Sequence, residues 1–170
     1  MILISNDVLS IVEMNKDMYF DVYKNSLDED NKRFVPDEVF ESEETAKKVV
    51  DQIIENYKLK EGPFVYAIIR NSDNKYLGHV QLIKINEGWE IGYHIAKPYT
   101  GKGYATNALS IFLDYINNNT SIKEIYGIVL KENIASRRVL EKCGFKVIYE
   151  GIANYQGEKR NILKTIYLSK

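Results

Sequence analysis

Apolar and polar positions follow two rhythms along this chain. Between residues 42 and 59, apolar side chains return every three or four positions, which is the spacing of one buried helix face. Acidic residues crowd the first turn of this segment, where they favour a helix that begins at Ser42 or Glu43. Similar spacing predicts helices over residues 14–26, 102–117 and 133–143. In the helix over residues 14–26 we expect Met18, Tyr19 and Val22 to be buried. In the helix over residues 42–59 the expected buried side chains are Ala46, Val49, Val50, Ile53, Ile54 and Tyr57.

Short runs of β-branched and aromatic residues predict the strands. Three of these runs are joined by the turn-forming segments NSDNK and NEG, which predicts an antiparallel meander. After the meander, strands and helices alternate, and a final hairpin turns around residues 154–157, which together predict a mixed α/β fold. The predicted strands cover residues 2–5, 8–12, 64–70, 76–85, 89–96, 124–130, 145–151 and 160–169.

Composition narrows the class of protein. With 170 residues, of which 45% are apolar, the chain can build one sizeable core, and we expect a single domain over residues 1–170. A net charge of −1 indicates neither nucleic acid nor an anionic membrane as a partner. No apolar run approaches the roughly 20 residues of a membrane span, and the first residues lack the features of a signal peptide, so we expect a cytoplasmic protein. Cys143 is the single cysteine, and with two histidines it offers no zinc spacing, so we expect no metal.

The segment PYTGKGYATNAL, residues 98–109, joins a glycine turn to the start of a predicted helix. Gly101 and Gly103 let the backbone approach a bulky group, and the first N–H groups of the helix point into the turn. This arrangement favours a phosphate or pyrophosphate. The same glycines are equally compatible with a tight surface connection, because short glycine motifs are weakly specific.

Two common phosphate-binding loops do not fit this segment. A Walker A loop requires a glycine where Ala96 stands and a serine or threonine where Gly103 stands. A Rossmann fingerprint requires glycine or alanine at Thr106 and an N-terminal βαβ unit, where this chain has an antiparallel meander. Neither a P-loop nor a Rossmann interpretation therefore holds for this segment.

IGYHIAKPYTGKGYATNAL, residues 91–109, resembles the acetyl-CoA-binding motif of the GNAT acyltransferase superfamily. NIASRRVLEKCGF, residues 133–145, resembles the second CoA-contacting segment of that family, and WEIGY together with RFVP and SEETAKKV is similar to the RimJ/RimL-type branch. The resemblance implies an α/β (α+β) GNAT fold. In this fold a twisted, mostly antiparallel mixed sheet is flanked by helices, and acetyl-CoA lies in the splay between two central strands.

The resemblance also assigns residues to the cofactor. Backbone amides near Gly101 and Gly103 would hold the pyrophosphate, and Pro98 stands where the family usually has Gln or Arg. Lys102 would meet phosphate charge or remain a solvated surface lysine. Asn133 would hydrogen-bond the pantetheine chain, and it is also a good N-cap. The residues assigned to acetyl-CoA are Ile95 and Lys97, whose backbone would pair with pantetheine, Gly101, Lys102, Gly103, Tyr104, Ala105, Thr106, Asn133 and Arg137; Arg138 is expected to be solvated.

Acetyl transfer from a thioester to an amine requires a neutral nucleophile, a stabilised oxyanion and a proton for the thiolate. At pH 7, deprotonation costs roughly 4.6 kcal/mol for a lysine-like amine and about 1.4 kcal/mol for an α-amine. Glu90 is the candidate base or a structural carboxylate, and His94, on the same strand face, is the second choice. The tyrosine that many relatives use as the acid is replaced by Leu140. Ser136 is the remaining candidate near the thiolate, with a purely cofactor-binding or helix-facing role as the alternative.

The resemblance implies direct transfer of acetyl to a primary amine in a ternary complex, with acetyl-CoA as co-substrate. The acceptor is a protein N-terminal α-amine or a small-molecule amine, and a homodimer is left open. The acidic runs SLDED and EVFESEE fit a cationic acceptor, and solvated loop charges explain them equally well. Tyr19, Tyr23, Tyr93 and Tyr155 are candidates for the acceptor pocket. A non-catalytic CoA-binding module and a generic nucleotide-phosphate binder are the alternatives, and Cys143 is expected to be a small buried hydrophobe rather than a nucleophile.

Overall fold

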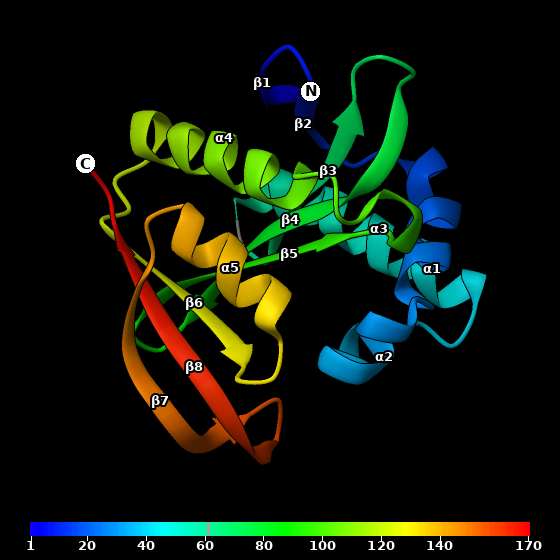
Figure 1. Ribbon diagram of the computed structural model, residues 1–170. Helices are drawn as coiled ribbons and strands as arrows, with labels where there is room; N and C mark the ends of the chain where they lie inside the picture. Colours follow the sequence, from blue (N-terminus) through cyan, green and yellow to red (C-terminus); the bar gives the residue numbers. More distant parts are fainter. Residues whose placement is uncertain (61) are drawn as a thin grey trace.

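The computed structural model describes residues 1–60 and 62–170 (Figure 1). In this part of the chain the strands form one eight-stranded sheet in the order β1-β2-β3-β4-β5-β6-β8-β7. The predicted meander is confirmed, because β3, β4 and β5 pair as antiparallel neighbours. The strands are β1 (Ile2–Ser5), β2 (Leu9–Glu13), β3 (Phe64–Arg70), β4 (Lys75–Ile85), β5 (Gly88–Ile95), β6 (Glu124–Leu130), β7 (Lys146–Tyr155) and β8 (Glu158–Leu168).

Helices cover both faces of the sheet. Successive side chains of a strand point to opposite faces, so Ile68 of β3 packs in the same cluster as Phe112, whereas Val65 and Ala67 pack with Val50 on the other side. The helices are α1 (Tyr19–Ser26), α2 (Glu29–Phe34), α3 (Glu43–Leu59), α4 (Tyr104–Asn119) and α5 (Ile134–Lys142), with 3₁₀ turns η1 (Lys16–Met18), η2 (Pro36–Glu38) and η3 (Lys97–Tyr99). No helix among the described residues is long and apolar enough to cross a bilayer.

The helix stripes predicted from periodicity are confirmed. Ala46, Val50 and Ile53 of α3 are buried, and Ser42 caps the helix by accepting a hydrogen bond from the Thr45 N–H at 3.2 Å. In α4, Phe112 is 1% exposed and packs against the sheet. These buried faces, rather than helix propensity, supply most of the stability of such helices.

Three details differ from the sequence-based expectation. The helix predicted over residues 14–26 is the 3₁₀ turn η1 followed by α1, which begins only at Tyr19. The start of α4 lies at Tyr104 and not at Lys102, because Gly103 has φ +79°, a left-handed conformation that a right-handed helix cannot include. The short helix α2 was not predicted, because its residues carry no apolar stripe and its buried side chain is the polar Asn31.

The central strands β5 and β6 are parallel, and they separate soon after they meet. Their pairing involves Trp89 with Ile125 and Glu90 with Tyr126. Beyond Glu90, β5 continues to Ile95 along β4, whereas β6 continues to Leu130 along β8. The predicted splay between two central strands is therefore present, and it opens directly after Glu90.

Candidate active site

A cavity of about 1050 Å³ occupies the opening between β5 and β6. The starts of α4 and α5 line it, and so do α2, η2 and the β7–β8 turn. A concave space of this size fits a large ligand and suits a binding site. The strand splay, the glycine turn and the two acidic runs of the sequence thus meet in one place.

The turn before α4 leaves its backbone open to the cavity. Gly101 and Gly103 have φ of +74° and +79°, and a Cβ added at either position would meet no atom within 4 Å. The first hydrogen bond of the helix joins the Asn107 N–H to the Gly103 carbonyl at 3.0 Å, and no side chain caps the helix. The N–H groups of the first helical turn therefore lack an intrahelical acceptor, which suits a diphosphate.

The start of α5 is held across the cavity by β5. Asn133 caps the helix, since its Oδ1 accepts from the Ser136 N–H at 3.2 Å. Tyr93 of β5 donates its hydroxyl to the Ser136 carbonyl at 2.9 Å, and burial raises the pKa of Tyr93 so that it stays a donor. Strand β5 is thereby tied to the helix start that carries Asn133 and Ser136.

Glu90 lies at the point where the strands separate. Burial is the main cause that raises its pKa to about 7, and the negative charges of Glu38 and Glu87 raise it further. Lys164 acts in the opposite direction, but its ammonium pairs with Glu87. A carboxyl group with a pKa near 7 can accept and return a proton at neutral pH.

Glu38 reaches the same cavity from η2. Its Oε1 accepts from Gln81 Nε2 at 2.9 Å, and its Oε2 lies 3.8 Å from His79 Nε2. Burial and the neighbouring His94 lower the pKa of His79 to about 3, so His79 is neutral. Burial is the main cause that raises the pKa of Glu38; the hydrogen bond from Gln81 acts in the opposite direction, and the charge of Asp37 raises it further.

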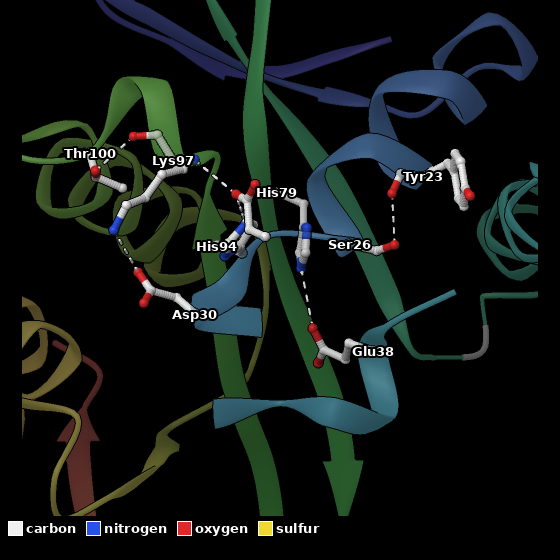
Figure 2. A network of polar contacts seen from close by, with 9 residues as sticks. Tyr23, Ser26, Asp30, Glu38, His79, His94, Lys97 and Thr100 are labelled. Carbon is white, nitrogen blue, oxygen red and sulfur yellow. Dashed lines mark hydrogen bonds and ion pairs between the residues drawn. The ribbon is translucent and has the colours of Figure 1, made fainter. Parts of the chain in front are cut away.

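Figure 2 shows how the segment that contains α2 and η2 is attached to strands β4 and β5 of the sheet. His79 and His94 lie side by side on β4 and β5, with ring centroids 6.1 Å apart. His94 Nε2 lies 3.2 Å from Asp28 Oδ2, which also accepts from the Lys97 N–H at 2.8 Å. Burial lowers the pKa of His94, and Asp28 partly offsets this effect. The carboxylates at the two ends of the α2–η2 segment thus approach neighbouring strands, and His94 is engaged with Asp28.

The cavity brings together nine of the twelve residues that the sequence assigned to acetyl-CoA or to catalysis, and the other three of this set, Lys97, Lys102 and Arg137, do not line it. The Lys97 N–H is already bonded to Asp28, and its ammonium is 3.5 Å from Asp30. Arg137 pairs with Glu141 at 2.9 Å along the outer face of α5, and Arg138 lines the cavity in its place. Lys102 is exposed and does not line the cavity. The residues that do line it are Glu90, Ile95, Gly101, Gly103, Tyr104, Ala105, Thr106, Asn133 and Ser136.

Residues 11–146 match the family model described as the acetyltransferase (GNAT) domain. The chain belongs to the GNAT acetyltransferase family. The fold agrees with this assignment, since a GNAT acetyltransferase structure from Bacillus anthracis has a TM-score of 0.83, 24% identity and 98% coverage of each chain. An acetyltransferase from Salmonella typhimurium, described as modifying the N-terminal serine of ribosomal protein L7/L12, has a TM-score of 0.83, 16% identity and full coverage of both chains.

Two curated N-acetyltransferases are similar to about half of the chain. Probable N-acetyltransferase YjcK of Bacillus subtilis is 36% identical over 98 residues, which cover 55% of this chain and 53% of that protein. Spermidine N(1)-acetyltransferase of Escherichia coli K12 is 32% identical over 97 residues, which cover 54% of this chain and 52% of that protein. The chain thus spans about half the length of these two relatives.

Two residues that line the cavity were not assigned to the site from the sequence. Both belong to η2: Glu38 was noted only as part of the acidic run EVFESEE, and Asp37 lies outside both acidic runs. Of the four candidate tyrosines, Tyr93 and Tyr155 line the cavity, whereas Tyr19 and Tyr23 do not. Tyr155 donates its hydroxyl to the Ile128 carbonyl of β6 at 3.1 Å.

The thiol of Cys143 is half-buried. Its Sγ lies 3.5 Å from the Thr106 carbonyl, and burial raises the pKa of this thiol to about 11. A thiol that stays protonated at neutral pH is a poor nucleophile. The structure therefore supports the interpretation of Cys143 as a small packing residue.

Proposed function

We propose that this chain transfers the acetyl group of acetyl-CoA to a primary amine in the cavity between β5 and β6. The observation that carries the proposal is that an uncapped helix start with open glycines and a carboxyl group with a pKa near 7 line one cavity. Family membership supplies the chemical class of the donor. The arrangement provides one side for a phosphorylated donor and one for an amine.

The helix starts are the groups that would hold acetyl-CoA. Backbone amides of Gly103, Tyr104 and Ala105 fit its pyrophosphate, because they stand at a helix start that no side chain caps and the adjoining glycine has open space around it. Asn133 would reach the pantetheine chain with its amide NH₂, since its Oδ1 caps α5. Arg138, which lines the cavity, replaces Arg137 as the candidate for phosphate charge.

Glu90 would accept the proton of the amine, directly or through water. The amine nitrogen forms a bond to the thioester carbonyl carbon, the proton passes to Glu90, and the carbon–sulfur bond then breaks. The departing thiolate receives one proton, so the products are an amide and a free thiol. Ser136 on α5 lines this cavity, and its hydroxyl would stabilise the thiolate by a hydrogen bond. Leu140, which stands where many relatives have the tyrosine acid, is 1% exposed and has no proton to donate.

The acceptor is proposed to be a primary amine, either a small molecule or a protein N-terminus. The spermidine acetyltransferase relative supports the first kind of acceptor. The expected cytoplasmic location and the homodimer stay predictions.

The direct test is thiol release from acetyl-CoA in the presence of an amine panel. The panel contains 1,5-diaminopentane, pentylamine and peptides that begin with Ser, Ala and Asp. Amine-dependent thiol release, together with an acetylated amine detected by mass spectrometry, supports acetyl transfer. Binding of CoA without turnover of any amine would indicate a non-catalytic CoA-binding module instead.

A further inference from the structure

The two sides of the cavity carry opposite charge. The basic residues that line it are Arg138 and Lys142, and both belong to α5. The acidic residues lie on α2, η2, the β4–β5 turn and β5, and they are Asp30, Asp37, Glu38, Glu87 and Glu90. The basic residues suit a polyanionic donor, and the elements with the acidic residues, called the acidic side below, suit a cationic acceptor.

Three carboxylates of the acidic side, those of Asp37, Glu38 and Glu90, have little positive charge beside them. Glu87 pairs with Lys164 and Asp30 pairs with Lys97, whereas Asp37 has no ion pair among the described residues. Glu38 receives a neutral hydrogen bond from Gln81, and its neighbour His79 is uncharged. Glu38 and Asp37 are both among the causes that raise the pKa of Glu90, so the three carboxyl groups repel one another.

Two buried side-chain amide oxygens that line the cavity lack a hydrogen-bond donor. Asn31 lies one turn before η2, since its carbonyl accepts from the Val35 N–H at 2.9 Å. The residue is 3% exposed and lines the cavity, and its Oδ1 has no hydrogen-bond partner in the described structure. Gln156 Oε1, at the β7–β8 turn, is another buried acceptor without a partner and lines the same cavity. Buried acceptors without donors are costly, and an ammonium group supplies three donors.

We infer that the acceptor amine carries a second positive charge, as a small diamine or polyamine does, and that Asp37 and Glu38 hold this distal ammonium while Glu90 faces the reacting nitrogen. The inference rests on the proposed acetyl transfer and narrows its substrate. A monocation would leave the charge of Asp37 and Glu38 uncompensated. A dication neutralises both ends of the acidic side and also provides donors to amide oxygens.

Three acceptors of equal length test the distal charge. They are 1,5-diaminopentane, pentylamine and 5-aminopentanoate, which end in an ammonium, a methyl and a carboxylate group. We expect kcat/KM for the diamine to exceed that for pentylamine by about tenfold or more, and 5-aminopentanoate to be the poorest acceptor. The preference should shrink as salt rises, because exposed charges are screened. Peptides that begin Ser-Lys and Ser-Asp show whether a peptide can supply the same charge.

The matched variants are Asp37→Asn and Glu41→Gln. Both remove one negative charge from neighbouring exposed positions, but Glu41 does not line the cavity. Asp37→Asn should lower kcat/KM for the diamine by about fivefold and change that for pentylamine by less than about twofold. Glu41→Gln should leave both values within about twofold of the parent.

The outcomes separate this inference from the proposed function. Equal turnover of pentylamine and the diamine, or an equal loss for both in Asp37→Asn, would overturn the dication while acetyl transfer stands. A Ser-Asp peptide as the best acceptor would do the same. Absence of thiol release with every amine would overturn the proposed function and the inference with it.

Discussion

The hydroxyl of Tyr93 donates a hydrogen bond to the backbone carbonyl of Ser136 at 2.9 Å, so one side chain of β5 holds the first turn of α5 across the cavity. The same turn carries Asn133, whose Oδ1 is fixed by the Ser136 N–H. Two hydrogen bonds to a single residue therefore set the position of the helix start that faces the donor.

Tyr93→Phe should weaken CoA binding without removing the fold. The change leaves the Ser136 carbonyl without its donor, which costs about 1 kcal/mol of unfolding free energy. We expect the Kd for CoA to rise about threefold to tenfold, with a smaller change in kcat, as measured by calorimetry and steady-state kinetics.

Tyr149→Phe is the matched control for Tyr93→Phe. The Tyr149 hydroxyl also donates to a backbone carbonyl, that of Ile152 at 2.8 Å, but Tyr149 is exposed and does not line the cavity. An equal loss of CoA affinity in both variants would remove the positioning role of Tyr93.

Gly103→Asp should abolish CoA binding. A side chain at φ +79° costs about 1 kcal/mol or more in backbone strain, and the carboxylate would stand at the helix start where the phosphates are expected. Gly157→Asp carries the same strain at φ +76° in the β7–β8 turn, and its Cβ also meets open space. Only the Gly103 variant should lose CoA in a thermal-shift titration, and CoA binding to Gly103→Asp at parental affinity would place the phosphates elsewhere.

Glu90→Gln should lower kcat and change the pH profile. Because the pKa of Glu90 is raised to about 7, the base is protonated in acid, and activity should rise as pH increases through 7. The rate loss should be about 10²-fold to 10⁴-fold for a lysine-like amine, with the Kd for CoA nearly unchanged. A Glu90→Gln profile that keeps the same rise near pH 7 would assign the base to another group.

The stability of Glu90→Gln provides a readout that is independent of turnover. The folded-state pKa of about 7 lies above the ordinary value of 4.5, so the stability associated with this carboxyl is fully present below pH 4.5 and is lost as pH rises through 7. The variant cannot ionise. Its Tm relative to the parent should therefore increase between pH 5 and pH 8, and a constant difference would show that Glu90 titrates normally.

Asp28→Asn should loosen the α2–η2 segment. Asp28 Oδ2 accepts from the Lys97 N–H at 2.8 Å and lies 3.2 Å from His94 Nε2, with 18% of its side chain exposed. We expect a loss of about 1–2 kcal/mol in unfolding free energy and a higher KM for the amine, measured by denaturant unfolding and kinetics.

Asp30→Asn is the control for Asp28→Asn. Asp30 pairs with the Lys97 ammonium at 3.5 Å, and its side chain is 52% exposed. Such surface pairs contribute less than about 1 kcal/mol. Equal losses in the two variants would contradict the anchoring role of Asp28.

Local patterns predicted the elements that have a clear apolar face. The stripe that includes Ala46, Val50 and Ile53 predicted α3, and the turn segments between strands predicted the meander from β3 to β5. The helix α2 lacks such a stripe. Its position depends instead on distant contacts, such as the one between Asp28 and the Lys97 N–H after the end of β5. Local sequence carries no record of such distant partners.

The site was predictable where a motif is continuous and not where the fold assembles it. Residues 101–106 and 133–136 each lie on one helix start, so a resemblance could place them. The contribution of Glu38 to the pKa of Glu90 depends on η2 approaching β5 in space. Which of Arg137 and Arg138 lines the cavity depends on how α5 is oriented about its axis. In this orientation Arg137 pairs with Glu141 one turn away, and Arg138 lines the cavity.

A crystal structure of this chain with acetyl-CoA measures the central claim most directly. The account predicts the pyrophosphate within hydrogen-bond distance of the backbone amides between Gly101 and Thr106, with the acetyl group at the opening beside Glu90. A diphosphate bound away from the start of α4, or an acetyl group remote from Glu90, would contradict it.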